Sequence, residues 1–161
     1  MELIFADRFE RYLEPWREMF GESDGIEYRL GAMPDVGFGS DAILMAAFLA
    51  HDRYGGRAVH GKAQVLENLR GDGLPDLILA TPLYSPIVDE VTDLEITGSN
   101  ISDMFTQCFE EVSQFNRANN VIAIKRLLVL VSALGFETIP PAVVARSFYR
   151  ASKLFPALWI D

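Results

Sequence analysis

Hydrophobic and polar positions along the chain fall into blocks, and the spacing within each block predicts one kind of element. Apolar residues recur at helical intervals over residues 9–20 and, most clearly, over 101–115. A last helix is predicted over 138–153, because two prolines stand near its start, where the first turn of a helix tolerates them. Pro15 lies inside the first helix and removes one backbone donor, so a kink or a division is expected there.

Short apolar runs between these helices predict strands. Residues 26–30 alternate apolar and polar positions, whereas most of the other runs are continuously apolar, as expected of strands buried on both faces. Residues 42–48 are ambiguous, because the run fits a buried parallel strand or a buried helix capped by Ser40. The remaining strands are expected at residues 3–5, 63–66, 77–80 and 127–131.

Helices that alternate with buried strands predict an α/β fold, with parallel strand pairs and helices on the faces of the sheet. The 161 residues fit a single domain, 1–161, and a composition that is 50% hydrophobic and 23% charged excludes disorder as the main state. Cys108 is the only cysteine, so no internal disulfide forms. No apolar run is long enough to span a membrane, and acidic residues stand before any leader-like apolar region. The expected location is therefore the cytoplasm.

The net charge of −9 comes from one stretch of the chain, because no Lys or Arg occurs between Arg70 and Arg117. An acidic surface repels nucleic acid and anionic membranes, which bind proteins through Lys and Arg. It favours a basic protein partner, although a solvated face that aids solubility is the alternative. The candidate partner-binding acids are Asp89, Glu90, Asp93 and Glu95.

Residues with catalytic or metal-binding chemistry are few. His51 and His60 have no Cys or carboxylate at a metal-ligand spacing, so no metal site is expected. Cys108 lies on the apolar stripe of the clearest helix, which predicts a core residue, because a nucleophilic thiol needs an accessible, electropositive setting. The chain also lacks a nucleophile elbow and the glycine-rich motifs that bind nucleotides. No catalytic residue is predicted.

Several segments, read in order, resemble the macro domain family, in its phage- and bacteria-type branch. The run 41–48, DAILMAAF, resembles the family motif DAIVNAAN, and Tyr54-Gly55-Gly56 falls at its first glycine-rich loop. Similar matches occur at 60–63, at 77–86 and from 127 to 145, so the resemblance covers about residues 3–153. It implies a three-layer α/β/α fold with a mixed, mostly parallel central sheet. It also implies an ADP-ribose cleft at the carboxyl ends of the strands.

This chain departs from the family pattern at the positions that hold the ligand. Ala32 replaces the Asp that binds adenine in the family. Met45 and Phe48 replace the two Asn of the DAIVNAAN motif, and the second of these Asn assists hydrolysis in the family. Where the family has an acidic residue after the first glycine-rich loop, this chain has Arg57. The second loop, which is rich in glycine in the family, reads ALGFET over residues 133–138 here. The ligand-cleft candidates carried over from the family are Ala32, Met45, Phe48, Gly55, Gly56, Arg57, Gly135, Phe136 and Glu137.

Each departure removes a contact to ADP-ribose. Met and Phe offer no hydrogen bonds to a ribose, and Glu137 would place a carboxylate near the diphosphate, a repulsion of roughly 4 kcal/mol per charge pair at 4 Å. Met45, Phe48 and Leu49 are expected to fill the former pocket. The resulting hypothesis is a non-catalytic macro-like domain without a cofactor, which binds a protein partner. An inhibitor or immunity-type protein is one role that would fit.

Two other hypotheses remain open. In the first, the chain is an ADP-ribosyl hydrolase that keeps an ADP-ribose or nucleotide pocket built from residues such as Arg57 and Gly135. In the second, the fold is an unrelated α/β fold.

Overall fold

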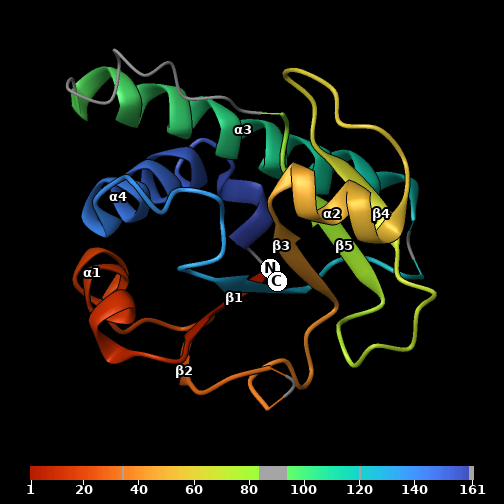
Figure 1. The fold of residues 1–161 in the computed structure, drawn as a ribbon, viewed down its shortest axis with the longest axis horizontal. Helices are drawn as coiled ribbons and strands as arrows, with labels where there is room; N and C mark the ends of the chain where they lie inside the picture. Colours follow the sequence, from red (N-terminus) through yellow and green to blue (C-terminus); the bar gives the residue numbers. More distant parts are fainter. Residues whose placement is uncertain (34, 84–93, 120, 160–161) are drawn as a thin grey trace.

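A six-stranded sheet forms the centre of the molecule in the computed structural model, which describes residues 1–161 except 34, 84–93, 120 and 160–161 (Figure 1). In chain order the elements are β1 Glu2–Asp7, α1 Glu10–Phe20, β2 Ile26–Leu30, β3 Ala42–Met45, α2 Ala47–Tyr54, β4 Gln64–Glu67, β5 Leu77–Ala80, α3 Leu94–Ala118, β6 Arg126–Leu130, α4 Pro141–Ser152 and a 3-10 turn Pro156–Trp159.

The strands lie in the order β2-β1-β6-β3-β5-β4, and every neighbouring pair is parallel except β4 with β5. Five parallel strands therefore end at the same side of the sheet, which we call the carboxyl edge. The residues that end these strands at the carboxyl edge are Asp7, Leu30, Met45, Ala80 and Leu130.

Successive residues of the central strands point to opposite faces, and each face has its own cover. Leu3 and Phe5 of β1 belong to a core cluster with α1, α3 and α4, whereas Ile4 and Ala6 belong to a second cluster with α2 and the loop 31–40. The sheet thus lies between two layers, and the α/β/α architecture with a mixed, mostly parallel sheet is confirmed.

The face of the sheet on which each connection runs matches the direction in which that connection moves along the sheet. The connections through α1 and α3 move along the sheet in one direction on the first face, and the loop 31–40 moves in the opposite direction on the second face. Right-handed crossovers require this reversal. The loop 31–40 is fastened by the buried Arg29, whose guanidinium donates to the carbonyl oxygens of Val36 and Phe38 at 2.9 and 2.7 Å.

Aromatic side chains fill the space between the helices of the first face. The ring of Phe148 in α4 lies 5.3 Å from Trp16, 4.9 Å from Phe105 and 5.1 Å from Phe109, measured between centroids. Most of these rings meet edge to face, an arrangement that stabilises aromatic pairs beyond the area they bury. Cys108 is buried in the same cluster, as predicted, and desolvation raises the pKa of its thiol.

Two local predictions left alternatives open, and the structure decides between them in part. Of the kink or division expected at Pro15, division is excluded, because α1 continues through it and is held by the buried Leu13 and Trp16. The ambiguous run 42–48 is neither a strand nor a helix throughout, since β3 ends at Met45 and α2 begins two residues later.

In the described part of the chain, no helix is long and apolar enough to cross a membrane.

Candidate functional site

The adjacent strands β6 and β3 mark a switch point at the carboxyl edge. The chain leaves β6 toward α4 on one face of the sheet and leaves β3 toward α2 on the other. Open α/β sheets bind their ligands in the crevice that such a divergence creates. Here the two loops approach closely, because a Cβ placed on Gly135 would lie 3.4 Å from the Cβ of Ala46.

The start of α2 is fixed by a residue from a neighbouring strand. Ala46 stands at the N-cap and has no side chain that could accept a hydrogen bond. The hydroxyl of Thr81, which directly follows β5, accepts from the backbone N–H of Ala47 at 3.0 Å, and the Thr81 N–H donates to the Met45 carbonyl at 3.0 Å. The buried Thr81 therefore determines where β3 stops and α2 begins.

This helix start turns Phe48 outward. Phe48 is 85% exposed and Leu49 is 41% exposed, whereas Ala47 and Ala50 take the side of α2 that packs on the sheet. The prediction that Phe48 and Leu49 fill the former pocket is wrong. Met45, the third residue expected to fill it, is buried within the second core cluster.

The remaining candidates from the sequence do not all meet at this crevice. Ala32 follows β2, which β1 and β6 separate from β3, so it lies at another part of the carboxyl edge. Gly55 and Gly56 end α2 with positive φ angles of 89° and 76°. Arg57 is exposed beyond them and its carbonyl accepts from Gln64. Six helical residues, about 9 Å of helix, lie between Phe48 and the first of these three positions.

Phe136 and Glu137 line a different space, a cavity of about 350 Å³ between the start of α1 and the loop 131–139. Asp7, at the end of β1, lines the same cavity and is buried, with one carboxylate oxygen, Oδ1, accepting from the Phe9 N–H at 3.0 Å. The sequence analysis did not single out Asp7. The signal was an acidic residue at the end of a buried strand. The lining residues are Asp7, Arg8, Phe9, Tyr12, Val131, Ser132, Phe136, Glu137, Ile139, Pro141 and Val144.

The candidate partner-binding acids cannot be placed on a surface here. Asp89, Glu90 and Asp93 lie outside the described residues, and the side chain of Glu95 is likewise not described. Other acids of the same stretch do not gather on one face. Asp72 lies beside α2, whereas Glu110 belongs to α3, which covers the other face of the sheet.

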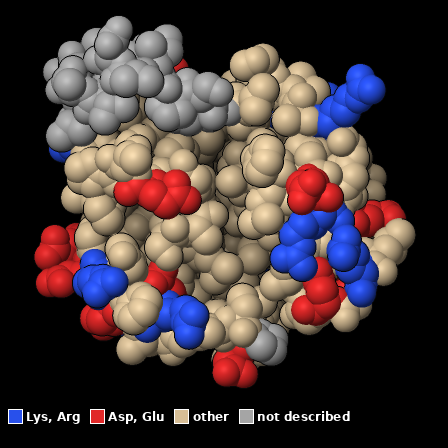
Figure 2. All heavy atoms as spheres, viewed as in Figure 1, with Lys and Arg blue, Asp and Glu red and all other residues tan. Residues whose placement is uncertain are grey.

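Asp72 joins α2 to the turn before β5. Its carboxylate accepts from the Tyr54 hydroxyl at 2.6 Å and from Asn68 at 2.9 Å, and Arg53 lies 3.8 Å away. The Tyr54 and Asn68 hydrogen bonds lower the pKa of Asp72 to about 2. Figure 2 shows cations and carboxylates side by side over the end of α2 and the adjacent turn, whereas the centre of this face carries little charge. The network therefore neutralises its own charges.

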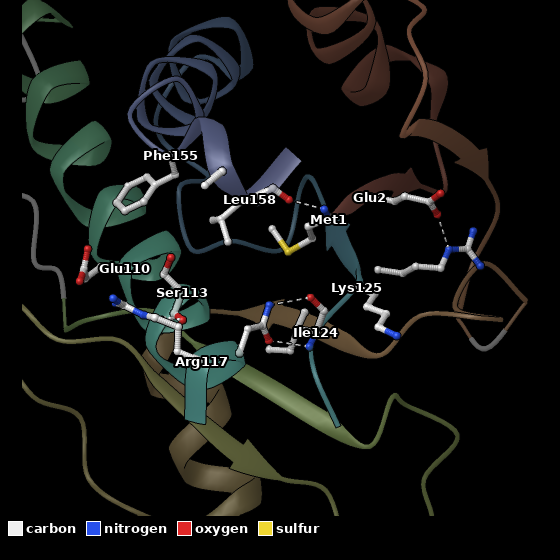
Figure 3. A pocket seen from close by; sticks show the side chains of 12 residues that line it. Met1, Glu2, Glu110, Ser113, Arg117, Ile124, Lys125, Phe155 and Leu158 are labelled. Carbon is white, nitrogen blue, oxygen red and sulfur yellow. Dashed lines mark hydrogen bonds and ion pairs between the residues drawn. The ribbon is translucent and has the colours of Figure 1, made fainter. Parts of the chain in front are cut away.

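A broad groove lies at the amino ends of β1 and β6, beside the last turns of α3 (Figure 3). Several of its polar groups are engaged in structural contacts. Asn116 exchanges two hydrogen bonds with the backbone of Ile124, at 3.0 and 2.7 Å, and Glu2 pairs with Arg126 at 2.9 Å. The terminal amine of Met1 donates to the Leu158 carbonyl. These contacts join α3, β1, β6 and the 3-10 turn, so the groove is the place where these elements meet.

Groups with catalytic chemistry are sparse in the part of the chain that the structure describes. No cluster of three or more His, Cys, Asp or Glu side chains there could hold a metal ion. His51 uses its Nδ1 atom in a 2.8 Å hydrogen bond with the Gly55 carbonyl, which closes the end of α2. A comparison with models of known protein families and with curated proteins found no match.

Proposed function

We propose that this chain is a non-catalytic, protein-binding module of macro-like type, and that Phe48 forms the centre of its binding surface. The observation that carries the proposal is the 85% exposure of a phenylalanine at the switch point of the sheet. Exposed apolar side chains at ligand-binding positions are typical of interaction surfaces, and aromatic residues supply much of the energy at the centre of protein interfaces. Leu49 extends the apolar surface beside it.

The macro-like part of the proposal is supported by the three-layer fold and by the position of the altered residues. Met45 and Phe48 stand at the end of β3 and the start of α2, on the carboxyl edge. Neither side chain offers a hydrogen bond to a ribose. The loop containing Gly135 approaches Ala46 closely, which leaves little space between the two loops.

The alternative, an ADP-ribosyl hydrolase, receives less support. It requires Arg57 to compensate for lost anchors near Gly135, but the length of α2 separates Arg57 from the start of that helix. Glu137 adds a carboxylate to the same loop. A partner with an apolar contact residue and a positive charge suits this edge better than a diphosphate does. An inhibitor of a basic protein is one role of this kind.

Photo-crosslinking in a lysate of the native host tests the proposal. A benzophenone amino acid replaces Phe48 in one variant and Leu154 in another, since Leu154 is 65% exposed at the end of α4. A specific partner should crosslink from position 48 and not from position 154. Against the identified partner, Phe48→Ala should weaken binding at least about tenfold, the loss expected of an interface hot spot.

The matched variant Leu154→Ala should leave the affinity unchanged. If the partner crosslinks equally from both positions, or if Phe48→Ala binds it like the original chain, the proposed surface is wrong.

A further inference from the structure

We propose that the cavity between α1 and the loop 131–139 binds an organic cation, namely an alkylammonium or guanidinium group with its attached hydrocarbon chain. The cavity lies at the carboxyl ends of the adjacent parallel strands β1 and β6. Its volume of about 350 Å³ suits a small ligand or a single long side chain. The site is separate from Phe48 and independent of the protein-binding role.

Asp7 supplies the recognition group. The residue is only 6% exposed, and its Oδ1 atom accepts from the Phe9 N–H. Among the described residues, the second oxygen, Oδ2, has no hydrogen-bond or ion-pair partner, although Asp7 lines the cavity. Oδ2 is not among the fully buried atoms without a partner, so it is accessible, and a carboxylate beside apolar walls attracts a cation more strongly than one in open water does. A cationic ligand in the cavity would provide that partner.

The walls of the cavity select the kind of cation. Phe9, Tyr12 and Phe136 contribute aromatic rings, and Val131, Ile139 and Val144 contribute aliphatic surface. Aromatic faces attract ammonium and guanidinium groups, and aliphatic surface accommodates a hydrocarbon chain. The Arg11 guanidinium, which does not line the cavity, lies 4.7 and 4.9 Å from the ring centroids of Phe9 and Tyr12, so both rings already take part in a cation–π contact.

The charges around the cavity favour the same ligand. Asp7 and Glu137 carry two negative charges, and Arg8 carries one positive charge, which leaves the lining with a net charge of −1. An anionic ligand such as a phosphate would meet two carboxylates and only one guanidinium, that of Arg8. A bare metal ion would find few oxygen ligands among rings and aliphatic side chains, whereas an organic cation uses both the carboxylates and the apolar walls.

Amide chemical-shift titration with butylammonium and butylguanidinium tests the inference directly. Butanol and butyrate serve as neutral and anionic controls with the same hydrocarbon chain. The two cations should shift the amides of Phe9, Ser132 and Glu137 in a saturable way, and the controls should not. Asp7→Asn keeps the oxygen that accepts from Phe9 but removes the charge, so it should weaken cation binding at least about tenfold.

Two further variants keep the test decisive. Asp24→Asn removes an exposed carboxylate on a distant loop and should leave the affinity unchanged. Glu137→Gln, at an exposed position, should weaken binding about two- to fivefold even if Asp7→Asn does not fold, as expected for a charge at a rim. Phe48→Ala should bind the cations like the original chain, which separates this site from the protein-binding surface.

The source of the cation can be read from a second pair of probes. An acetylated, amidated arginine peptide that binds as tightly as butylguanidinium would identify the ligand as a side chain of another protein. Exclusion of the peptide with retention of butylguanidinium would identify a free small molecule. Saturable binding of butyrate, equal affinity in Asp7→Asn, or no shifts with either cation at tens of millimolar would overturn the inference.

Discussion

Replacing Phe48 and Phe148 by alanine compares one substitution at opposite extremes of exposure. Phe48 is 85% exposed, whereas Phe148 is 1% exposed and contacts several aromatic rings of the core. If Phe48 is retained for binding and not for packing, its removal should leave the free energy of unfolding almost unchanged. The same truncation at Phe148 should be among the most damaging in the protein.

The magnitudes follow from burial. Full burial of a phenylalanine contributes about 1.5–3 kcal/mol, so the small buried part of Phe48 accounts for about 0.2–0.5 kcal/mol. Alanine favours the helix over phenylalanine by about 0.5 kcal/mol, which offsets that loss. Phe148→Ala removes a ring from a close-packed cluster and should cost about 3–5 kcal/mol. A change of that size lowers the Tm by roughly 6–20 °C in a protein of this length.

Urea denaturation followed by tryptophan fluorescence measures both variants, since Trp16 lies in the core beside Phe148. A cost above about 1.5 kcal/mol for Phe48→Ala would show that Phe48 packs against the protein, because surface changes usually stay within about 0.5 kcal/mol. That result would refute the exposed binding surface. A negligible cost for Phe148→Ala would refute the aromatic core instead.

Three other outcomes are expected. The pKa of Asp72 is about 2 in the folded protein, below the ordinary carboxyl value of about 4. Asp72 therefore stabilises the folded state above about pH 4, and this contribution is lost as the pH falls toward about 2. Asp72→Asn should make the Tm fall less steeply with acid. ADP-ribose should bind no tighter than about millimolar by isothermal titration, a free energy near about −4 kcal/mol, and micromolar binding would revive the hydrolase alternative. Arg29→Met should cost about 1–3 kcal/mol by leaving two carbonyls without their donor. It should also raise amide exchange over 31–40, whereas Arg146→Met at an exposed site should do neither.

Strands and helices with a clear period were predictable because the deciding information is local. The strands at 26–30 and 77–80 have the predicted bounds, since turn-forming residues limit each run on both sides. The run 42–48 could not be divided from its sequence, because its residues suit a strand or a helix equally. The division depends on the Thr81 hydroxyl, which reaches Ala47 from another strand.

The candidate site was predictable only in outline. Its location at the carboxyl edge follows from the fold class, but the orientation of Phe48 depends on where α2 begins. Apolar character alone predicted burial for that residue, and this prediction failed. Asp7 was missed because the other wall of its cavity comes from the loop 131–139, which lies beside it only when β6 pairs with β1.

The position of β6 has a consequence for how the protein folds. The sheet consists of a β2-β1 part from the start of the chain and a β3-β5-β4 part from its middle, and β6 pairs with β1 on one side and β3 on the other. Each part joins strands that are near in sequence, but neither contacts the other until β6 arrives. Pairing β6 with β1 and β3 closes long loops of the chain, which is entropically costly and slows folding. During synthesis the edges of the two parts therefore stay unpaired until residue 130 has emerged. Substitutions in β6 should slow refolding more than equally destabilising ones in β4.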